Sequence, residues 1–190
     1  GKDLHTAVVR HLTACIDTAT AIDSPFGHVF LENVFPDDVY RQILTHLPDP
    51  AVYDRAADRH YGNGMQVRSL YKLTKAKLTM LPTELSHFWR SLASALTADE
   101  VKRALFHKLS KDLCFRYGVP KSQVAELTAH ARPTLYRETE GFEIPPHPDT
   151  RKKVITMPFY LPADHSQLDL GTALYRRKIL AWPFGTWHNR

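Results

Sequence analysis

The chain has 190 residues, of which 43% are hydrophobic and 24% charged, the ordinary balance of a soluble globular domain. Its net charge of +5 is spread along the sequence, which argues against a nucleic-acid groove, and no apolar run approaches the ~20 residues of a membrane span. The first residues lack a signal-peptide core, and Cys15 and Cys114 lack metal-ligand spacing. We therefore expect a cytoplasmic protein with free, buried thiols.

The N-terminal part of the chain predicts helices. Apolar residues at helical spacing predict one helix over 3–21, and the stretch 24–27 then breaks the chain before a short strand over 28–31. The sequence Pro36-Asp37-Asp38 predicts the start of a second helix, because proline and acidic residues suit a helix N-terminus.

Two further helices are expected between about residues 81 and 117. Leu81-Pro82-Thr83 opens one of them, and Thr97 to Glu100 matches a capping box that opens another. The second of these helices should continue to about Tyr117, where Gly118 ends it.

The stretch from about Asp54 to Tyr71 has little periodicity and contains Gly62 and Gly64. Glycines permit large backbone changes, and long loops in compact domains are often functional. We expect this loop to border the mouth of an active site and to become ordered when substrate binds.

Everything beyond Val124 reads mostly as strand. The chain is therefore expected to be a single α+β domain over 1–190, with helical support over about 1–123 and a β-barrel-like core over about 124–190.

His147-Pro148-Asp149 is the most informative motif. In an extended segment residues two apart point the same way, so His147 and Asp149 can bind one metal ion while Pro148 faces away. A distant His188 would complete a 2-His-1-carboxylate face, which leaves positions open as non-haem Fe(II) oxygenases require. His165 is the rival third ligand, but it lies in a predicted turn. The alternative for the first pair is a structural His–Asp hydrogen bond.

The flanking residues make the motif more specific. Before the motif come an aromatic residue, Tyr136, and a glycine turn at Gly141. After His147 and Asp149 come an aromatic-Leu pair (Tyr160-Leu161), a Gly-Thr-x-Leu strand (Gly171 to Leu174) and the distal His188. This order resembles the 2-oxoglutarate/Fe(II)-dependent oxygenase superfamily, and its prolyl-hydroxylase-like branch in particular. The resemblance covers roughly the last third of the chain.

The resemblance implies a double-stranded β-helix (jelly-roll, cupin-like) core that uses Fe(II), 2-oxoglutarate as cosubstrate, and O2. It assigns the metal to His147, Asp149 and His188, and it assigns hydrogen bonds to the cosubstrate carboxylates to Tyr136 and Tyr160. The family also places a basic residue on the strand after the distal histidine. Arg190 is the candidate for that role here, and we expect the core to be incomplete at the C-terminus of the displayed chain.

The same resemblance implies hydroxylation of an unactivated C–H bond. Asp149 fills the position that halogenating relatives replace with a small residue, so hydroxylation, desaturation or ring closure is favoured over halogenation. The compact size favours a small molecule, such as an amino acid or natural-product intermediate, with Arg137, Arg68 and Tyr175 as candidate substrate contacts. The alternatives are a protein side-chain hydroxylase or nucleic-acid demethylase on the same core, and a non-catalytic jelly-roll binding module. The sequence does not define the oligomeric state.

Overall fold

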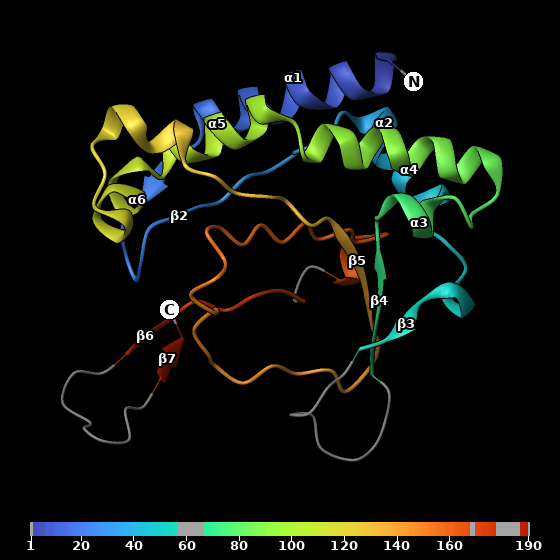
Figure 1. Ribbon diagram of the computed structural model, residues 1–190. Helices are drawn as coiled ribbons and strands as arrows, with labels where there is room; N and C mark the ends of the chain where they lie inside the picture. Colours follow the sequence, from blue (N-terminus) through green and yellow to red (C-terminus); the bar gives the residue numbers. More distant parts are fainter. Residues whose placement is uncertain (1, 57–66, 168–169, 178–186, 190) are drawn as a thin grey trace.

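The computed structural model describes residues 2–56, 67–167, 170–177 and 187–189 (Figure 1). The α-helices within these ranges are α1 (Lys2–Thr18), α2 (Asp37–Thr45), α3 (Lys75–Leu78), α4 (Thr83–Leu96), α5 (Asp99–Lys108) and α6 (Ser110–Tyr117). Short 3-10 turns are η1 (Pro50–Val52), η2 (Lys121–Glu126) and η3 (His165–Gln167). The strands are β1 (Ala21–Ile22), β2 (His28–Val29), β3 (Asp54–Arg55), β4 (Arg68–Lys72), β5 (Thr134–Glu138), β6 (Tyr175–Arg177) and β7 (Trp187–Asn189).

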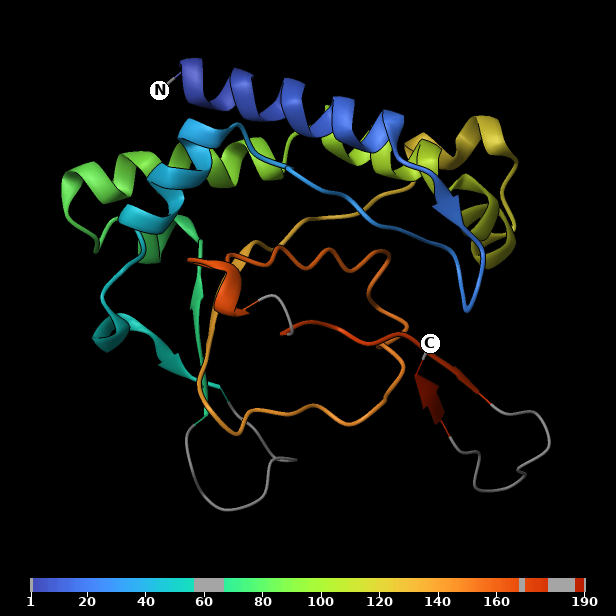
Figure 2. The same cartoon turned by 180° about the vertical axis from the view of Figure 1, so that it is seen from behind.

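The long helices form one layer, in which α1 lies along α4 and α5 (Figures 1 and 2). The apolar stripe of α1 is fully buried at Val8, Leu12 and Ile16, which explains why this periodic segment is helical. Trp89 of α4 is also buried, and its indole N–H donates to the backbone oxygen of His46 at 2.6 Å. None of the described helices is both long and apolar enough to cross a membrane.

The predicted helices are confirmed, with two differences: the first ends at Thr18 and not at residue 21, which lies in β1, and the last is divided in two. One helix was expected to run to Tyr117, whereas the chain ends α5 at Lys108 and begins α6 at Ser110. The predicted capping box is wrong, because the Thr97 hydroxyl donates back to Ala93 O at 2.9 Å and so closes α4. Gly118 ends α6 with a φ of 66°, the left-handed conformation for which glycine is favoured.

An antiparallel sheet with the order β3-β4-β5 lies below the helical layer. Its register places Tyr71 opposite Leu135 and Ser69 opposite Arg137. Tyr71 and Leu135 belong to the core formed with the helices, so one face of the sheet is directed toward the helical layer at this end. The predicted loop from Asp54 to Tyr71 is therefore wrong at its two ends, which are strands. Its central residues 57–66 lie outside the described residues.

The segment after β5 is mostly irregular, so the prediction of strand throughout the C-terminal part is wrong. The residues around His147 form no strand, and the three nearby prolines explain this because they cannot donate to a ladder. The run 154–161 has no ladder partner among the described residues, yet it keeps the period-two burial of an extended chain. Ile155, Met157, Phe159 and Leu161 are half-buried, while Thr156, Pro158 and Tyr160 are exposed.

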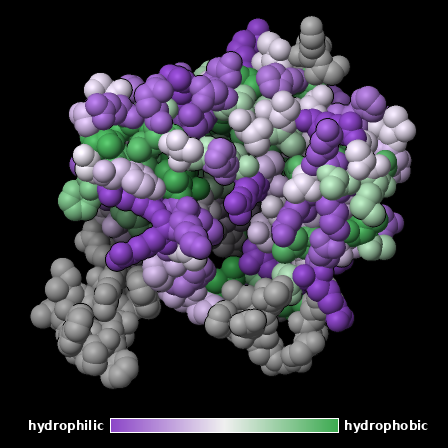
Figure 3. Space-filling model, in the orientation of Figure 1, coloured by the Kyte–Doolittle hydropathy of each residue, from purple (hydrophilic) through white to green (hydrophobic). Residues whose placement is uncertain are grey.

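The α+β class is confirmed, and the strands within the described ranges form three small antiparallel sheets, none of them closed. A double-stranded β-helix is not confirmed. The two free cysteines are half-buried rather than fully buried, which corrects the expectation for Cys15 and Cys114. On the face shown in Figure 3, hydrophilic and hydrophobic residues are mixed, and hydrophobic ones gather over the end of the layer where α5 and α6 lie.

Candidate metal and cosubstrate site

The ring of His147 is held in one tautomer by a neighbouring carbonyl. Its Nδ1 lies 2.9 Å from the backbone oxygen of Pro145. A carbonyl oxygen can only accept, so Nδ1 carries the hydrogen, and in the neutral ring Nε2 keeps its lone pair. Histidines that bind metals commonly use this arrangement, in which one ring nitrogen donates to a carbonyl and the other binds the ion. His147 is also exposed, so that lone pair is accessible.

The Asp149 carboxylate is oriented by two donors. Lys153 Nζ donates to Oδ1 at 2.6 Å, and the Thr156 hydroxyl donates to Oδ2. Partial burial alone would raise the pKa of Asp149, but the hydrogen bonds from Lys153 and Thr156 and the nearby charges of Lys153 and a protonated His147 outweigh burial and lower it. Asp149 is therefore ionised at neutral pH, with His147 close enough to act on it electrostatically.

The turn that follows Asp149 is hydrogen-bonded to α6. Arg116 donates from Nη1 to Val154 O at 3.3 Å and from Nη2 to Arg151 O. Val154 and Ile155 also pack against a small core of buried residues from α5, α6 and η2. These contacts fix the backbone of the segment on which Lys153 and Thr156 lie, although no regular secondary structure supports it.

Tyr160 lies on the same side of the extended run as Thr156. The alternation over 154–161 turns Phe159 and Leu161 into the core beneath the helices and turns Tyr160 away from it. The Tyr160 ring is 52% exposed, and its hydroxyl hydrogen-bonds the Thr172 hydroxyl. The end of the run is anchored by the Tyr40 hydroxyl, which donates to Pro162 O at 2.7 Å.

Tyr136 is also directed away from the helices. It is 53% exposed and sits in β5 next to Leu135, whose side chain takes the opposite, core-facing side. The Arg68 guanidinium lies 4.2 Å above the Tyr136 ring and 4.9 Å from the Phe142 ring centroid. Arg68 Nε is 3.2 Å from Glu138 Oε1, but its N–H is not directed at that oxygen, so the contact is an ion pair without a hydrogen bond. Both tyrosines named by the resemblance thus lie on the side of the chain opposite the helical core.

For His188, the third expected ligand, the structure describes only the backbone. His188 lies in β7 opposite Arg176 of β6, and its side chain falls outside the described residues, as does all of Arg190. Among the described side chains no group of three His, Cys, Asp or Glu could hold a metal ion. His165, the rival ligand, lies in the exposed turn η3 as expected.

Of the three expected substrate contacts, Arg68 and Arg137 line one cavity at the sheet, and Tyr175 is not among its lining residues. The sheet register puts Arg68 opposite Glu138 and Arg137 opposite Ser69, so the two arginines belong to opposite faces. Tyr175 is half-buried at the start of β6, and no contact among the described residues joins it to either arginine.

Lys153, Thr156 and Arg116 are the residues that sequence reasoning missed. Lys153 stands four residues and Thr156 seven residues after Asp149, spacings that carry no motif of their own. The alternation of 154–161 does carry a signal for Thr156, because a polar residue among regularly spaced apolar ones indicates the face opposite the core.

Comparison of the chain with protein-family models, with curated proteins and with solved structures finds no match. The chemistry of the donor set is therefore the test of whether a metal fits. A neutral imidazole with Nε2 available and an adjacent ionised carboxylate are suitable ligands for a divalent first-row metal. His147 and Asp149 thus offer two of the three donor types that the resemblance implies.

Proposed function

We propose that the chain is an Fe(II)- and 2-oxoglutarate-dependent dioxygenase that hydroxylates an unactivated C–H bond of a small molecule. The observation that carries the proposal is that hydrogen bonds orient two candidate ligands, His147 and Asp149, which are two residues apart in the sequence. Nδ1 of His147 donates to Pro145 O, which directs the Nε2 lone pair outward, and two donors orient the Asp149 carboxylate beside it. A purely structural His–Asp pair would instead hydrogen-bond to each other, and no such bond joins them among the described contacts.

His147, Asp149 and His188 are the residues that would hold the iron. Iron with 2-oxoglutarate and O2 supplies the oxidising chemistry for C–H hydroxylation when it is bound. The chain's own contribution is to hold the Nδ1 hydrogen of His147 on Pro145 O, which leaves Nε2 as the binding nitrogen, and to keep Asp149 ionised. Lys153 and Thr156 act as positioning residues for Asp149, and Arg116 secures the turn that carries them.

Tyr136 and Tyr160 are proposed to bind the carboxylates of 2-oxoglutarate. A phenol hydroxyl donates a hydrogen bond to an anion, and such bonds to charged groups are stronger than neutral ones. Support comes from their orientation, because both rings are about half exposed and both are turned away from the helical core, as is Thr156. A tyrosine whose purpose was packing would be expected on the other face, where Tyr71 is 2% exposed.

A turnover assay tests the proposal and does not require the substrate to be identified in advance. The protein is mixed with Fe(II), 2-oxoglutarate and O2, and succinate is measured alone and with a panel of amino acids and small metabolites. We expect succinate formation that increases with a subset of the panel and is abolished in Asp149→Ala. Full succinate formation by Asp149→Ala would show that another site is responsible, and the proposal would fail.

A further inference from the structure

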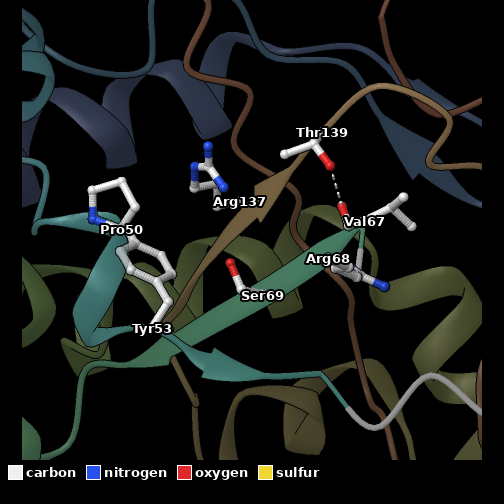
Figure 4. A pocket seen from close by; sticks show the side chains of 7 residues that line it. All are labelled: Pro50, Tyr53, Val67, Arg68, Ser69, Arg137 and Thr139. Carbon is white, nitrogen blue, oxygen red and sulfur yellow. Dashed lines mark hydrogen bonds between the residues drawn. The ribbon is translucent and has the colours of Figure 1, made fainter. Parts of the chain in front are cut away.

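A cavity of about 260 Å³ lies at the end of the β3-β4-β5 sheet, and neither His147 nor Asp149 lines it. It is lined by residues from η1, the segment before β3, β4 and β5: Pro50, Tyr53, Val67, Arg68, Ser69, Arg137 and Thr139. Figure 4 shows the side chains of Arg137, Ser69 and Tyr53 around a common space, with Pro50 beside them. The lining is mostly polar, which indicates a polar ligand rather than an apolar one.

Arg137 brings a positive charge that nothing else described neutralises. Within the described part of the chain its guanidinium has no ion pair or hydrogen bond, and its electrostatic contact is with the Tyr53 ring hydroxyl. Arg68 is different, because it is paired with Glu138 and lies against the Tyr136 and Phe142 rings on the other face. The cavity therefore has one uncommitted guanidinium among its described lining residues.

Two hydroxyl groups accompany that guanidinium. Ser69 is directly opposite Arg137 in the register, so their side chains emerge side by side on one face. Burial raises the pKa of Tyr53 despite the opposing charge of Arg137, so its hydroxyl keeps its proton and can donate. Thr139 is already used, because its hydroxyl donates to Val67 O at 3.3 Å (Figure 4).

We propose that this cavity binds the carboxylate of a small organic acid, with Arg137 as the charged partner and Ser69 and Tyr53 as neutral donors. The guanidinium fork matches a carboxylate with two parallel hydrogen bonds. One uncommitted positive charge suits a monoanion better than a phosphate dianion, which would leave a negative charge unpaired. The small volume admits an acid of about amino-acid size. The proposal rests on the cavity alone and holds whether or not the chain binds iron.

The test is titration of the metal-free protein with N-acetylglycine, followed by amide chemical shifts in two-dimensional NMR spectra. N-acetylglycinamide, which lacks the carboxylate, and inorganic phosphate are the comparison probes. Arg137→Gln removes the charge while keeping a similar length, and Arg90→Gln, an exposed arginine of α4, is the matched control. The same spectra report whether each variant is folded.

We expect N-acetylglycine to shift the amides of Ser69 and Thr139 in the wild type and in Arg90→Gln. Binding should be roughly ten-fold or more weaker in Arg137→Gln, since a hydrogen bond to a charged group is being lost. Equal shifts with N-acetylglycinamide, or unchanged binding in a folded Arg137→Gln, would overturn the assignment. Tighter binding of phosphate than of N-acetylglycine would overturn the choice of a carboxylate.

Discussion

Thr156→Val is the substitution that examines the positioning of Asp149 most closely. Valine has nearly the shape of threonine, so the exposed face of the run 154–161 is preserved while the hydroxyl that donates to Asp149 Oδ2 is lost. The remaining donor, Lys153, still holds Oδ1 at 2.6 Å. Asp149 should therefore stay ionised but be held at one oxygen only, and the metal would have to restrict the added motion of the carboxylate when it binds.

The magnitude follows from the hydrogen bond and its exposure. A hydrogen bond to a charged group contributes about 1.5–3 kcal/mol when well shielded. The Asp149 side chain is 40% exposed, so solvent screening reduces the expected loss to about 1–1.5 kcal/mol. That free energy corresponds to roughly a five- to ten-fold increase in the Fe(II) dissociation constant.

Anaerobic equilibrium dialysis against Fe(II) in the presence of 2-oxoglutarate measures this constant. Thr150→Val is the matched control, because Thr150 is an exposed threonine of the same segment that makes no side-chain contact with Asp149. The reasoning is refuted if Thr156→Val binds Fe(II) within two-fold of the wild type, or if Thr150→Val weakens binding as much.

Three other outcomes are expected. Tyr160→Phe should raise the 2-oxoglutarate dissociation constant roughly ten-fold in calorimetric titrations, and an unchanged value would assign Tyr160 to packing. Trp89→Ala should lower the free energy of unfolding in urea by about 3–5 kcal/mol, because Trp89 is buried, whereas Phe115→Ala, at a 93% exposed position, should change it by less than about 0.5 kcal/mol. Hydrogen bonds from Lys102 and Arg103 lower the pKa of Asp99 in the folded protein. The stability that ionised Asp99 contributes is therefore complete above the pKa it has in the unfolded chain, and it is lost as the pH falls through the pKa it has in the folded protein. In Asp99→Asn the urea concentration at the unfolding midpoint should therefore decrease less between pH 5 and pH 3 than in the wild type. An equal decrease in both proteins would exclude this contribution.

The helical half could be predicted because each long helix buries an apolar stripe that repeats at helical spacing. The division at Leu109 could not, because the apolar pattern continues through it, and both helices pack against η2, which follows them in the sequence. Strand β4 was missed for a different reason. Its five residues alternate weakly, and its partner β5 is more than sixty residues away in the sequence, so no local signal predicts the pairing.

The sequence names the proposed ligands of the candidate site but not the residues that orient them. His147 and Asp149 carry a recognisable motif, but the carbonyl of Pro145 and the side chains of Lys153 and Thr156 become partners only through the irregular path of the chain. That path depends on Arg116, which comes from a helix thirty-five residues before the turn it holds. Contacts of this kind have no spacing rule, so a sequence pattern cannot predict them.

The central claim is that His147, Asp149 and His188 together bind one iron ion. Anaerobic dialysis followed by measurement of iron per chain tests it directly, with each of the three residues changed to alanine in turn and His165→Ala as the control. We predict about one Fe(II) per chain in the wild type and in His165→Ala, and loss of that iron in the other three variants. Retention of one tightly bound Fe(II) by folded His147→Ala or Asp149→Ala would contradict the account.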